Sequence, residues 1–402
     1  MSDPLRALRS HNFQLFTLGG LASAMGGQIF SVALGWELYE RTHDPGALGL
    51  VGLLQVIPVV TLALPAGDLA DRTDRRKLIL RVLPLLALCP LLLSWFSYIQ
   101  APLPLVYGAI LLEGIFAAVV NPARQAMLPQ LVDEDTLASA IAWNSSRWQM
   151  AATLGPALGG GLIAYFKVAW PVYLLATFTM TVFWFCVLAL RPRPLPPREA
   201  PSESIIQRLA VGASFVRSMP LMLAALTLDM VAVLLGGAVA LLPVYARDIL
   251  HTGPTGLGWL RAAPAVGALA MGIYVAWKAP LKRAGLALLW AVIGFGVATI
   301  IFGLSKNFYL SMIALALTGA CDNISVVVRH TLVQALTPNH MQGRVSAVNS
   351  VFISISNELG AAESGYAARW LGTVAAVVVG GVGTILSVIG VHLAWPQVAR
   401  LG

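Results

Sequence analysis

Apolar runs of about twenty residues alternate with short polar segments along the whole chain. A helix that crosses a bilayer needs about 20 mostly apolar residues. Twelve segments meet this requirement, and we expect each to form a membrane-spanning helix: residues 12–37, 46–66, 78–99, 104–123, 138–165, 168–190, 219–246, 255–278, 284–304, 308–328, 344–366 and 371–395. The pattern predicts an all-α membrane protein.

Composition supports this prediction. Hydrophobic residues make up 58% of the 402 positions, whereas soluble domains contain about 45–50% apolar residues. The three cysteines, Cys89, Cys186 and Cys321, lie in separate apolar runs without the C-x-x-C spacing of metal or redox sites. The histidines show no ligand spacing either, so we expect no disulfide, no metal site and no cofactor.

The distribution of charge predicts an orientation. If the N-terminus is cytoplasmic and twelve spans alternate, most of the 26 lysine and arginine residues fall on the cytoplasmic side. This asymmetry satisfies the positive-inside rule. The net charge of +8 is therefore a topology signal. A nucleic-acid surface would gather basic residues on one soluble face, and we expect no nucleic-acid partner. Both termini are expected in the cytoplasm.

The middle of the chain interrupts the pattern. Residues 191–204 are rich in proline and charge and form no span. Residues 205–218 have the pattern of an amphipathic helix lying along the membrane surface, or of a polar linker with a frayed helical turn. We therefore expect an N-terminal six-helix bundle over residues 1–190, a cytoplasmic linker over 191–218, and a C-terminal six-helix bundle over 219–402.

The two halves are related to each other. A shift of 205 residues places Gly114 on Gly319 and Arg124 on Arg329. The same shift places Asn144 on Asn349, and several further glycines coincide. Six spans repeated with the same orientation imply a pseudo-twofold axis along the membrane normal and a cavity between the halves.

One charged stretch, GDLADRTDRR at residues 67–76, separates the second and third apolar runs. It resembles the loop signature G-x-L-x-D-R-x-x-R-R of the major facilitator superfamily. Asp74 replaces the usual second glycine, a form associated with the enterobactin-exporter-like and macrolide-efflux-like branch. The matching residues are Gly67, Asp71, Arg72, Arg75 and Arg76.

The resemblance implies that this stretch is a conformational latch. Asp71 would meet the N-terminus of the eleventh span, where the helix dipole favours a carboxylate, and the arginines would pair with nearby acids. The simpler interpretation is a basic turn that obeys the positive-inside rule. The second-half counterpart at residues 272–283 has Ala276 in place of the acid, so a second latch would be degraded.

A second stretch, ATLGPALGGG at residues 152–161, resembles the antiporter motif G-x-x-x-G-P-x-x-G-G of the same superfamily. Gly155, Pro156, Gly159 and Gly160 match, and Ala151 replaces the leading glycine. Small residues allow close helix packing, and proline loosens the helix. The alternative is ordinary small-residue packing. The resemblance implies a fold of twelve helices in two pseudo-symmetric bundles and favours export by exchange.

Ionisable residues inside the spans are costly and mark candidate functional sites. At a rise of about 1.5 Å per residue, Glu113 in the fourth span and Arg147 in the fifth have similar depths. We therefore expect them to be neighbours, as a structural ion pair or as a gated site. Gln28 in the first span is a candidate to face the cavity.

Asp229 lies near the middle of the seventh span, with no basic residue near it on the same helix. It is a candidate for proton or substrate binding. The alternative is a carboxyl that is kept protonated, or bonded to a neighbouring helix, for packing alone. Asp322 and Arg329 lie on one stripe of the tenth span. Arg329 and its repeat partner Arg124 are expected to anchor at lipid headgroups, with pairing to Asp71 or the acidic run 133–135 as the alternative. Arg261 and Glu358 are a further possible pair.

No catalytic apparatus is recognisable. The chain lacks the G-x-x-x-x-G-K-[ST] phosphate loop and a soluble domain large enough for an enzyme. We expect a secondary transporter of the bacterial inner membrane, a proton-coupled antiporter that exports small amphipathic compounds such as drugs or siderophores. Alternatives are a lipid or lysolipid flippase, or a non-transporting receptor. The expected partners are the substrate, protons and the lipid bilayer, with the protein a monomer.

Overall fold

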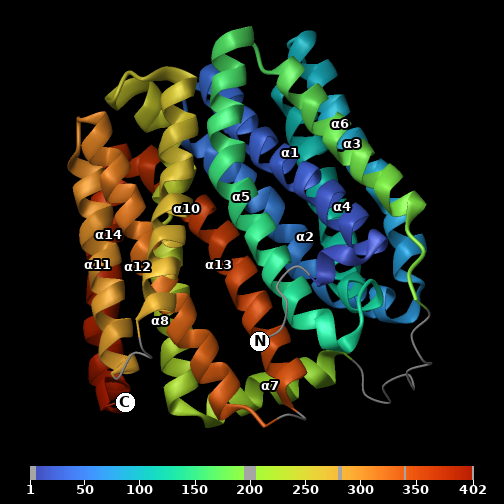
Figure 1. The fold of residues 1–402 in the computed structure, drawn as a ribbon. Helices are drawn as coiled ribbons and strands as arrows, with labels where there is room; N and C mark the ends of the chain where they lie inside the picture. The colour runs from blue at the N-terminus through green and yellow to red at the C-terminus, as the bar shows by residue number, and fades with distance from the viewer. Residues whose placement is uncertain (1–5, 194–204, 279–282, 339–340, 401–402) are drawn as a thin grey trace. The chain divides into compact units, whose positions relative to one another are not determined.

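The computed structural model describes residues 6–193, 205–278, 283–338 and 341–400 (Figure 1). All regular elements in this part of the chain are helical. Linker residues 194–204 lie outside the described ranges.

The first six predicted spans each correspond to one long helix: α1 (His11–Thr42), α2 (Pro45–Arg72), α3 (Arg75–Tyr98), α4 (Leu103–Met127), α5 (Glu134–Phe166) and α6 (Trp170–Ala189). Short turns join them. The turn between α2 and α3 contains only Thr73 and Asp74, and the Asp74 side chain accepts a hydrogen bond from the Lys77 amide, which caps α3. Most of the charged signature stretch is therefore helical.

The seventh predicted span is broken. Helix α8 (Pro220–Leu235) ends at Gly236, and a 3₁₀ turn (Ala238–Leu241), the short α9 (Leu242–Val244) and a π-helical turn (Tyr245–Ile249) follow. Two consecutive glycines and Pro243 explain the break, because glycine costs helix stability and proline removes a backbone donor.

The last five spans form α10 (Gly253–Trp277), α11 (Ala284–Leu304), α12 (Phe308–Leu336), α13 (Gln342–Leu371) and α14 (Thr373–Ala394). Ten elements within the described residues are long and apolar enough to span a membrane. Helices α5 and α13 are also long, at 33 and 30 residues, but they are not among these ten. The predicted all-α membrane fold is confirmed.

The chain divides into two compact units. The first unit contains Met1–Glu37 and Ile57–Ile205, and the second contains Leu38–Val56 and Ile206–Gly402. Residues Leu38–Val56, here called the α1–α2 segment, form the end of α1 and the start of α2 but belong to the second unit. The predicted bundle limits 1–190 and 219–402 stay a prediction.

In the first unit, α3 packs against both α4 and α6 (Figure 1). Its core joins side chains from these helices and from α1. They include Phe13, Ile79, Leu83, Val120, Ala123, Phe183 and Val187, all fully buried.

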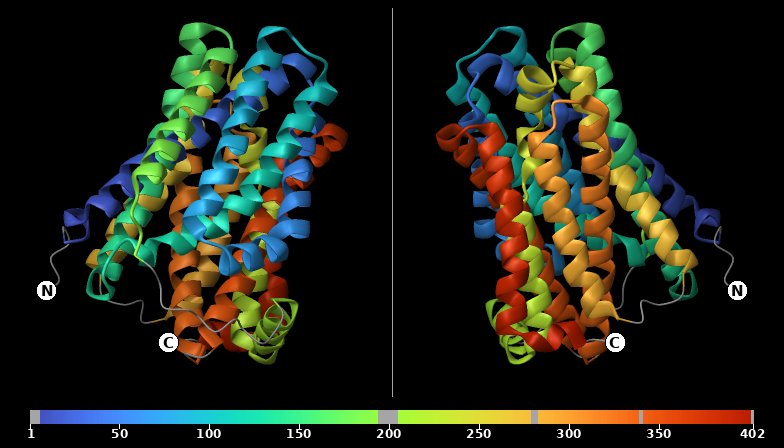
Figure 2. Two further views of the ribbon diagram at one scale, coloured as in Figure 1. Left: turned by 90° about the vertical axis from the view of Figure 1, so that its right-hand side faces the viewer. Right: turned by 90° about the vertical axis from the view of Figure 1, so that its left-hand side faces the viewer.

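In the second unit, α12 packs against α10 and α11, and α11 packs against α14 (Figure 2). The α10–α12 contact depends on two glycines. A Cβ atom at Gly267 would overlap the carbonyl of Ala316, and one at Gly319 would overlap that of Pro264. Small residues at such a crossing let membrane helices approach closely.

Residues 205–218 form the helix α7 (Ile205–Ser218). Its buried face includes Gly212, where an added Cβ would lie 2.8 Å from the Arg344 carbonyl of α13. Val216 shares a hydrophobic cluster with Val345 and Val348 of α13. The apolar face of α7 therefore packs against α13. Contact of α7 with the membrane surface stays a prediction.

Candidate functional site

The second unit contains a buried ion pair. Asp229 of α8 pairs with Arg329 of α12, and their side chains are only 8% and 4% exposed. Ser325 lies one turn before Arg329 and donates its hydroxyl to Asp229 Oδ1 at 3.5 Å. Arg329 Nε has no hydrogen-bond partner among the described residues. A buried charge in a membrane helix needs such a partner, so each residue stabilises the other inside the fold.

A second carboxylate lies on the same stripe of α12. Asp322 is one turn before Ser325, and both line a small cavity with Asp229 and Phe295 of α11. Asp322, Ser325, Asp229 and Arg329 thus form a polar track through the apolar interior of the second unit. We call these four residues the acid track.

The structure corrects one expectation here. Arg329 is not a headgroup anchor, because its side chain is buried against Asp229. Asp229 is bonded to a neighbouring helix, which was one of the alternatives for this residue. The predicted tenth span stops at residue 328, whereas α12 continues to Leu336. Arg329 therefore lies about 10 Å inside the helix end, close to the depth of Asp229. The longer helix is the signal that sequence analysis missed.

The first unit has an equivalent contact. Arg124 of α4 donates from Nη2 to the Ser23 hydroxyl of α1 at 2.8 Å, and its guanidinium lies 4.4 Å from the centre of the Phe183 ring. Arg124 is therefore no headgroup anchor either. The 205-residue shift takes Arg124 to Arg329 and Ser23 to the neighbour of Asp229. The repeat keeps the arginine in both units but gives the second unit a carboxylate.

Arg147 of α5 lies beside this contact. Its Nη2 donates to Asn144 Oδ1 at 2.7 Å, and its guanidinium lies 5.7 Å from the centre of the Phe16 ring. It also lies against Gly20 of α1, where an added Cβ would overlap the guanidinium. The contacts found for Arg147 are thus with neutral groups and an aromatic ring.

Glu113 of α4 lies near Cys89 of α3, close enough for the two groups to interact electrostatically. The hydrogen bond and the ring contact of Arg147 go to other residues. Proximity of Glu113 to Arg147 stays a prediction.

The signature stretch is organised by its arginines. Arg72 pairs with Asp68 at 2.7 Å in an exposed contact, and Arg75 Nη2 lies 4.0 Å from Asp71 Oδ1. Arg75 also donates to the Ala126 carbonyl at the end of α4, at 2.7 Å. Gly67 lies in the last turns of α2. The predicted contact of Asp71 with the eleventh span stays a prediction.

Arg76 ties α3 to the end of α6. Its guanidinium donates to the carbonyl oxygens of Val187, at 3.2 Å, and Leu188, at 2.7 Å. These carbonyls belong to the last turn of α6, where the regular helical hydrogen bonds end. The Val187 carbonyl also accepts from the Leu190 amide, at 3.2 Å. Cationic side chains at this position also interact favourably with the helix dipole.

We expect Arg76→Gln to destabilise the protein by about 1–3 kcal/mol, because hydrogen bonds from a charged group contribute about that much. Thermal unfolding in detergent measures this effect. The matched control is Arg72→Gln, which removes an exposed ion pair and should cost at most about 1 kcal/mol. Equal losses for the two variants would contradict the capping role.

The antiporter-like motif lies in α5 and packs against α1. A Cβ atom at Gly155 would lie 2.6 Å from Gln28 Cβ, and one at Gly159 would lie 3.1 Å from Ile29 Cα. Pro156 and Gly160 are buried. The motif therefore gives the close helix approach expected of it, and Gln28 lies at that contact.

Sequence analysis missed a group of contacts made by the α1–α2 segment. Glu40 pairs with Arg247 at 3.3 Å, and Asp44 pairs with Arg369 of α13 at 3.5 Å. The Tyr39 hydroxyl donates to Asp248, next to Arg247 in the π-helical turn. These partners are some 200 residues or more apart in the chain, so no local pattern reveals them.

Glycines bring the α1–α2 segment directly against α13. A Cβ atom at Gly365 would overlap the backbone of Gly49, and one at Gly52 would lie 2.8 Å from the Ala362 nitrogen. Ion pairs and direct contacts between glycine backbones thus hold this segment to the rest of the second unit.

Elsewhere in that unit, Arg261 and Glu358 lie close enough to interact electrostatically, as expected.

The acidic run 133–135 has a different partner from those proposed. Asp133 pairs with Arg193, just after α6, and this guanidinium holds the pKa of Asp133 below its usual range. A depressed pKa means that the contact stabilises the fold at neutral pH and is lost as the pH falls through the folded-state pKa. Both side chains are exposed.

Metal binding has no support among the described residues. They contain no group of three or more histidine, cysteine, aspartate or glutamate side chains placed to hold an ion. The three cysteines are free.

The helices, the two units and the buried charges define a membrane transporter of the major facilitator class. The fold matches a bacterial homologue of the human lysosomal transporter Spinster, with a TM-score of 0.71 at 12% identity, covering 98% of this chain and 96% of that one. It also matches a POT family transporter in complex with 5-aminolevulinic acid, with a TM-score of 0.75 at 11% identity and 96% of each chain covered.

The chain belongs to the transmembrane secretion effector family, whose model matches residues 2–399. It is similar to the enterobactin exporter EntS of Citrobacter koseri, with 28% identity over 385 residues, 95% of this chain and 91% of that protein. The exporter of the same name from Escherichia coli O1:K1 / APEC is 28% identical over 393 residues, 97% of this chain and 92% of the relative. The protein is a secondary transporter of the membrane, not an enzyme.

Proposed function

We propose that the protein exports small amphipathic organic compounds, of the siderophore or drug type, in exchange for protons. The observation that carries this proposal is the acid track, in which a buried carboxylate is held by a buried arginine. The name of the similar enterobactin exporters supports the export direction. The bacterial inner membrane, with both termini in the cytoplasm, is the proposed location.

Protonation of Asp229 would supply the coupling. A neutral Asp229 leaves Arg329 with an uncompensated charge in an apolar surrounding, which destabilises the present arrangement. A second conformation, in which Arg329 reaches water, then becomes favoured. Asp322, about two turns from Arg329 on the same face, is positioned to exchange protons with Asp229 through the shared cavity. Inward proton movement supplies about 2.3 kcal/mol per charge per 100 mV.

The first unit supplies the features that suit the substrate. Arg124 and Arg147 lie against Phe16, Phe183 and neutral polar groups. Guanidinium groups beside aromatic rings suit a compound that combines a ring with negative charge. We propose that these arginines orient such a compound during export.

The signature stretch would act as the latch. Arg75 and Arg76 bind the ends of α4 and α6 and thereby hold the α2–α3 turn rigid, so that Asp71 is presented in a fixed position. The motif in α5 would let that helix pack tightly against α1 and still bend at Pro156.

Everted membrane vesicles with an acidic interior test the proposed function. We expect vesicles containing the protein to accumulate enterobactin, and a proton uncoupler to abolish the accumulation. Asp133→Asn serves as a control, because it removes a carboxylate from an exposed ion pair and should transport normally. Accumulation that persists after uncoupling would contradict proton exchange, and no accumulation of enterobactin or of amphipathic dyes would contradict export.

A further inference from the structure

The outward face of α3 carries a regular stripe of exposed residues. Spacings of four and three residues place on one helix face Lys77, Arg81, Pro84, Leu88, Leu91 and Trp95, all of them exposed. Leu88 and Leu91 are 44% and 42% exposed. The stripe thus begins with two basic residues, continues with apolar ones and ends at an aromatic residue.

The apolar part of the stripe borders a groove. Pro84, Leu88 and Leu91 of α3 form one wall, and Thr177, Thr181 and Trp184 of α6 form the other. The groove is open along one side. Since both helices belong to the first unit and pack together, the groove is formed within that unit alone.

The polar groups of this groove are satisfied by the protein itself. The hydroxyls of Thr177 and Thr181 donate to carbonyls one turn earlier in α6, at 3.1 and 2.8 Å. Proline at position 84 has no N–H to offer the Leu80 carbonyl, and the Trp184 indole donates to that carbonyl instead, at 3.0 Å. The walls therefore present mainly apolar surface, which fits a hydrocarbon chain better than a polar ligand.

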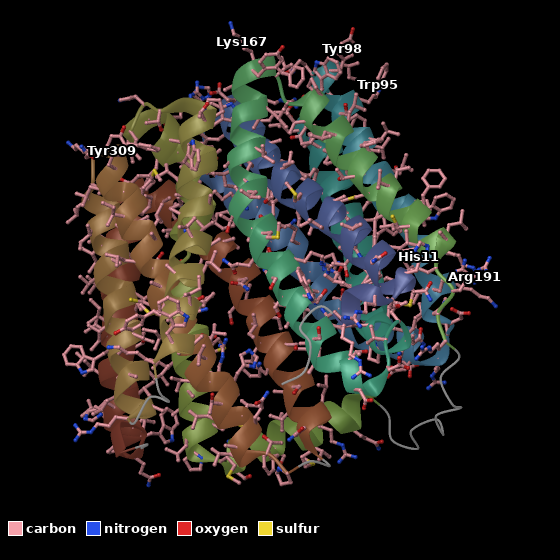
Figure 3. All side chains as sticks on the ribbon, viewed as in Figure 1. His11, Trp95, Tyr98, Lys167, Arg191 and Tyr309 are labelled. Carbon is pink, nitrogen blue, oxygen red and sulfur yellow. The ribbon has the colours of Figure 1, made fainter. Side chains whose placement is uncertain are left out.

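Basic residues lie at one end of the groove. Lys77 and Arg81 are one turn apart in the first turns of α3, and neither has an ion-pair partner within the described part of the chain. Arg191 is exposed just after α6, whose last carbonyls bind Arg76 next to Lys77. Figure 3 shows Arg191 far from Trp95 and Tyr98, which lie near Lys167 at the opposite end of the first unit.

The dimensions match one leaflet of a bilayer. Ten residues separate Arg81 from Leu91, which is about 15 Å along the helix. The hydrocarbon core is about 30 Å thick, so the groove extends from the basic end to about the bilayer centre. Arginine and lysine at this level attract anionic lipid headgroups.

We propose that this face of α3 and α6 binds an anionic diacyl phospholipid of the leaflet that contacts Lys77 and Arg81. One acyl chain lies in the groove between Pro84 and Leu91, and the phosphate lies against Lys77 and Arg81, with Arg191 adding positive charge. The bound lipid covers the apolar groove between the two helices and stabilises the first unit.

Native mass spectrometry of the purified protein tests this proposal, with palmitoyl-oleoyl phosphatidylglycerol and phosphatidylcholine as competing probes. The acyl chains are identical, so the comparison isolates the headgroup. We expect the wild type to prefer phosphatidylglycerol by about tenfold or more, since two basic residues contribute. Equal affinity for the two lipids would overturn the proposal.

Two variants separate the headgroup from the chain. Lys77→Gln combined with Arg81→Gln should abolish the preference but keep weak binding of both lipids, whereas Leu91→Trp, which fills the groove, should weaken both. Lys167→Gln removes one exposed positive charge at the other end of the same unit and should leave the preference unchanged. A preference that survives the double substitution, or that Lys167→Gln removes equally well, would contradict the site.

Discussion

Replacing Asp229 by asparagine is expected to lower the stability of the protein by about 3–5 kcal/mol, because it leaves the Arg329 charge buried without its counterion. The two side chains are 8% and 4% exposed, so water cannot replace the missing carboxylate in this conformation. Arg329→Gln should cost a similar amount for the same reason. Thermal unfolding in detergent, followed by tryptophan fluorescence, measures both losses.

The double variant supplies the control. Asp229→Asn combined with Arg329→Gln leaves two neutral polar groups that are able to bond to each other, so its loss should be clearly smaller than the sum of the single losses. Ser325 would keep a partner in the asparagine carbonyl. Additive losses would mean that the two residues act independently, and the ion pair would then have no energetic role.

The second large effect is expected for Gly365→Val, which should lower the rate of transport at least about tenfold. Its side chain would occupy the position of the Gly49 backbone and so separate the α1–α2 segment from α13. Glycine is required there because the two backbones touch. Overpacking of this kind costs about 1–3 kcal/mol, which disfavours any conformation that needs this contact. Vesicle transport assays and unfolding temperatures measured together distinguish a blocked transporter from an unfolded one.

The matched control for this prediction is Gly390→Val in α14. An added Cβ at Gly390 meets no atom within 4 Å, so the same substitution introduces no clash. This variant should transport at nearly the wild-type rate. If Gly365→Val transports as well as Gly390→Val, the contact between Gly49 and Gly365 has no role in the transport cycle.

The helices themselves were predictable from the sequence. A spanning helix needs a long apolar run, and each of the twelve runs corresponds to one helix or, for residues 219–246, to a broken one. Helix ends were less predictable, since water-facing turns of a helix carry no apolar signal. The extension of α12 to Leu336 moved Arg329 from the expected helix end into the interior.

Partners between helices were largely beyond prediction. Counting residues gives the depth of a side chain, but it does not give the rotation of one helix against another. Asp229 and Arg329 are 100 positions apart in the chain, and only packing of α8 against α12 brings them together. The contacts of the α1–α2 segment with Arg247 and Arg369 were unpredictable for the same reason, because they too depend on how helices pack.

The repeat between the halves was the most informative feature of the sequence for the site. It placed Arg124 and Arg329 at one register, and the structure gives both arginines a partner on the first spanning helix of their half. The partner is a serine in one half and an aspartate in the other. This difference is a reason to assign proton coupling to the second half and substrate contacts to the first.

The most direct test of this account is a comparison of two transport modes in vesicles containing Asp229→Asn. Exchange of labelled for unlabelled substrate needs only the conformational cycle, whereas accumulation in vesicles with an acidic interior needs proton coupling. The account predicts that the variant keeps exchange but loses accumulation. Accumulation at the wild-type level would contradict the assignment of Asp229 as the residue that carries the proton.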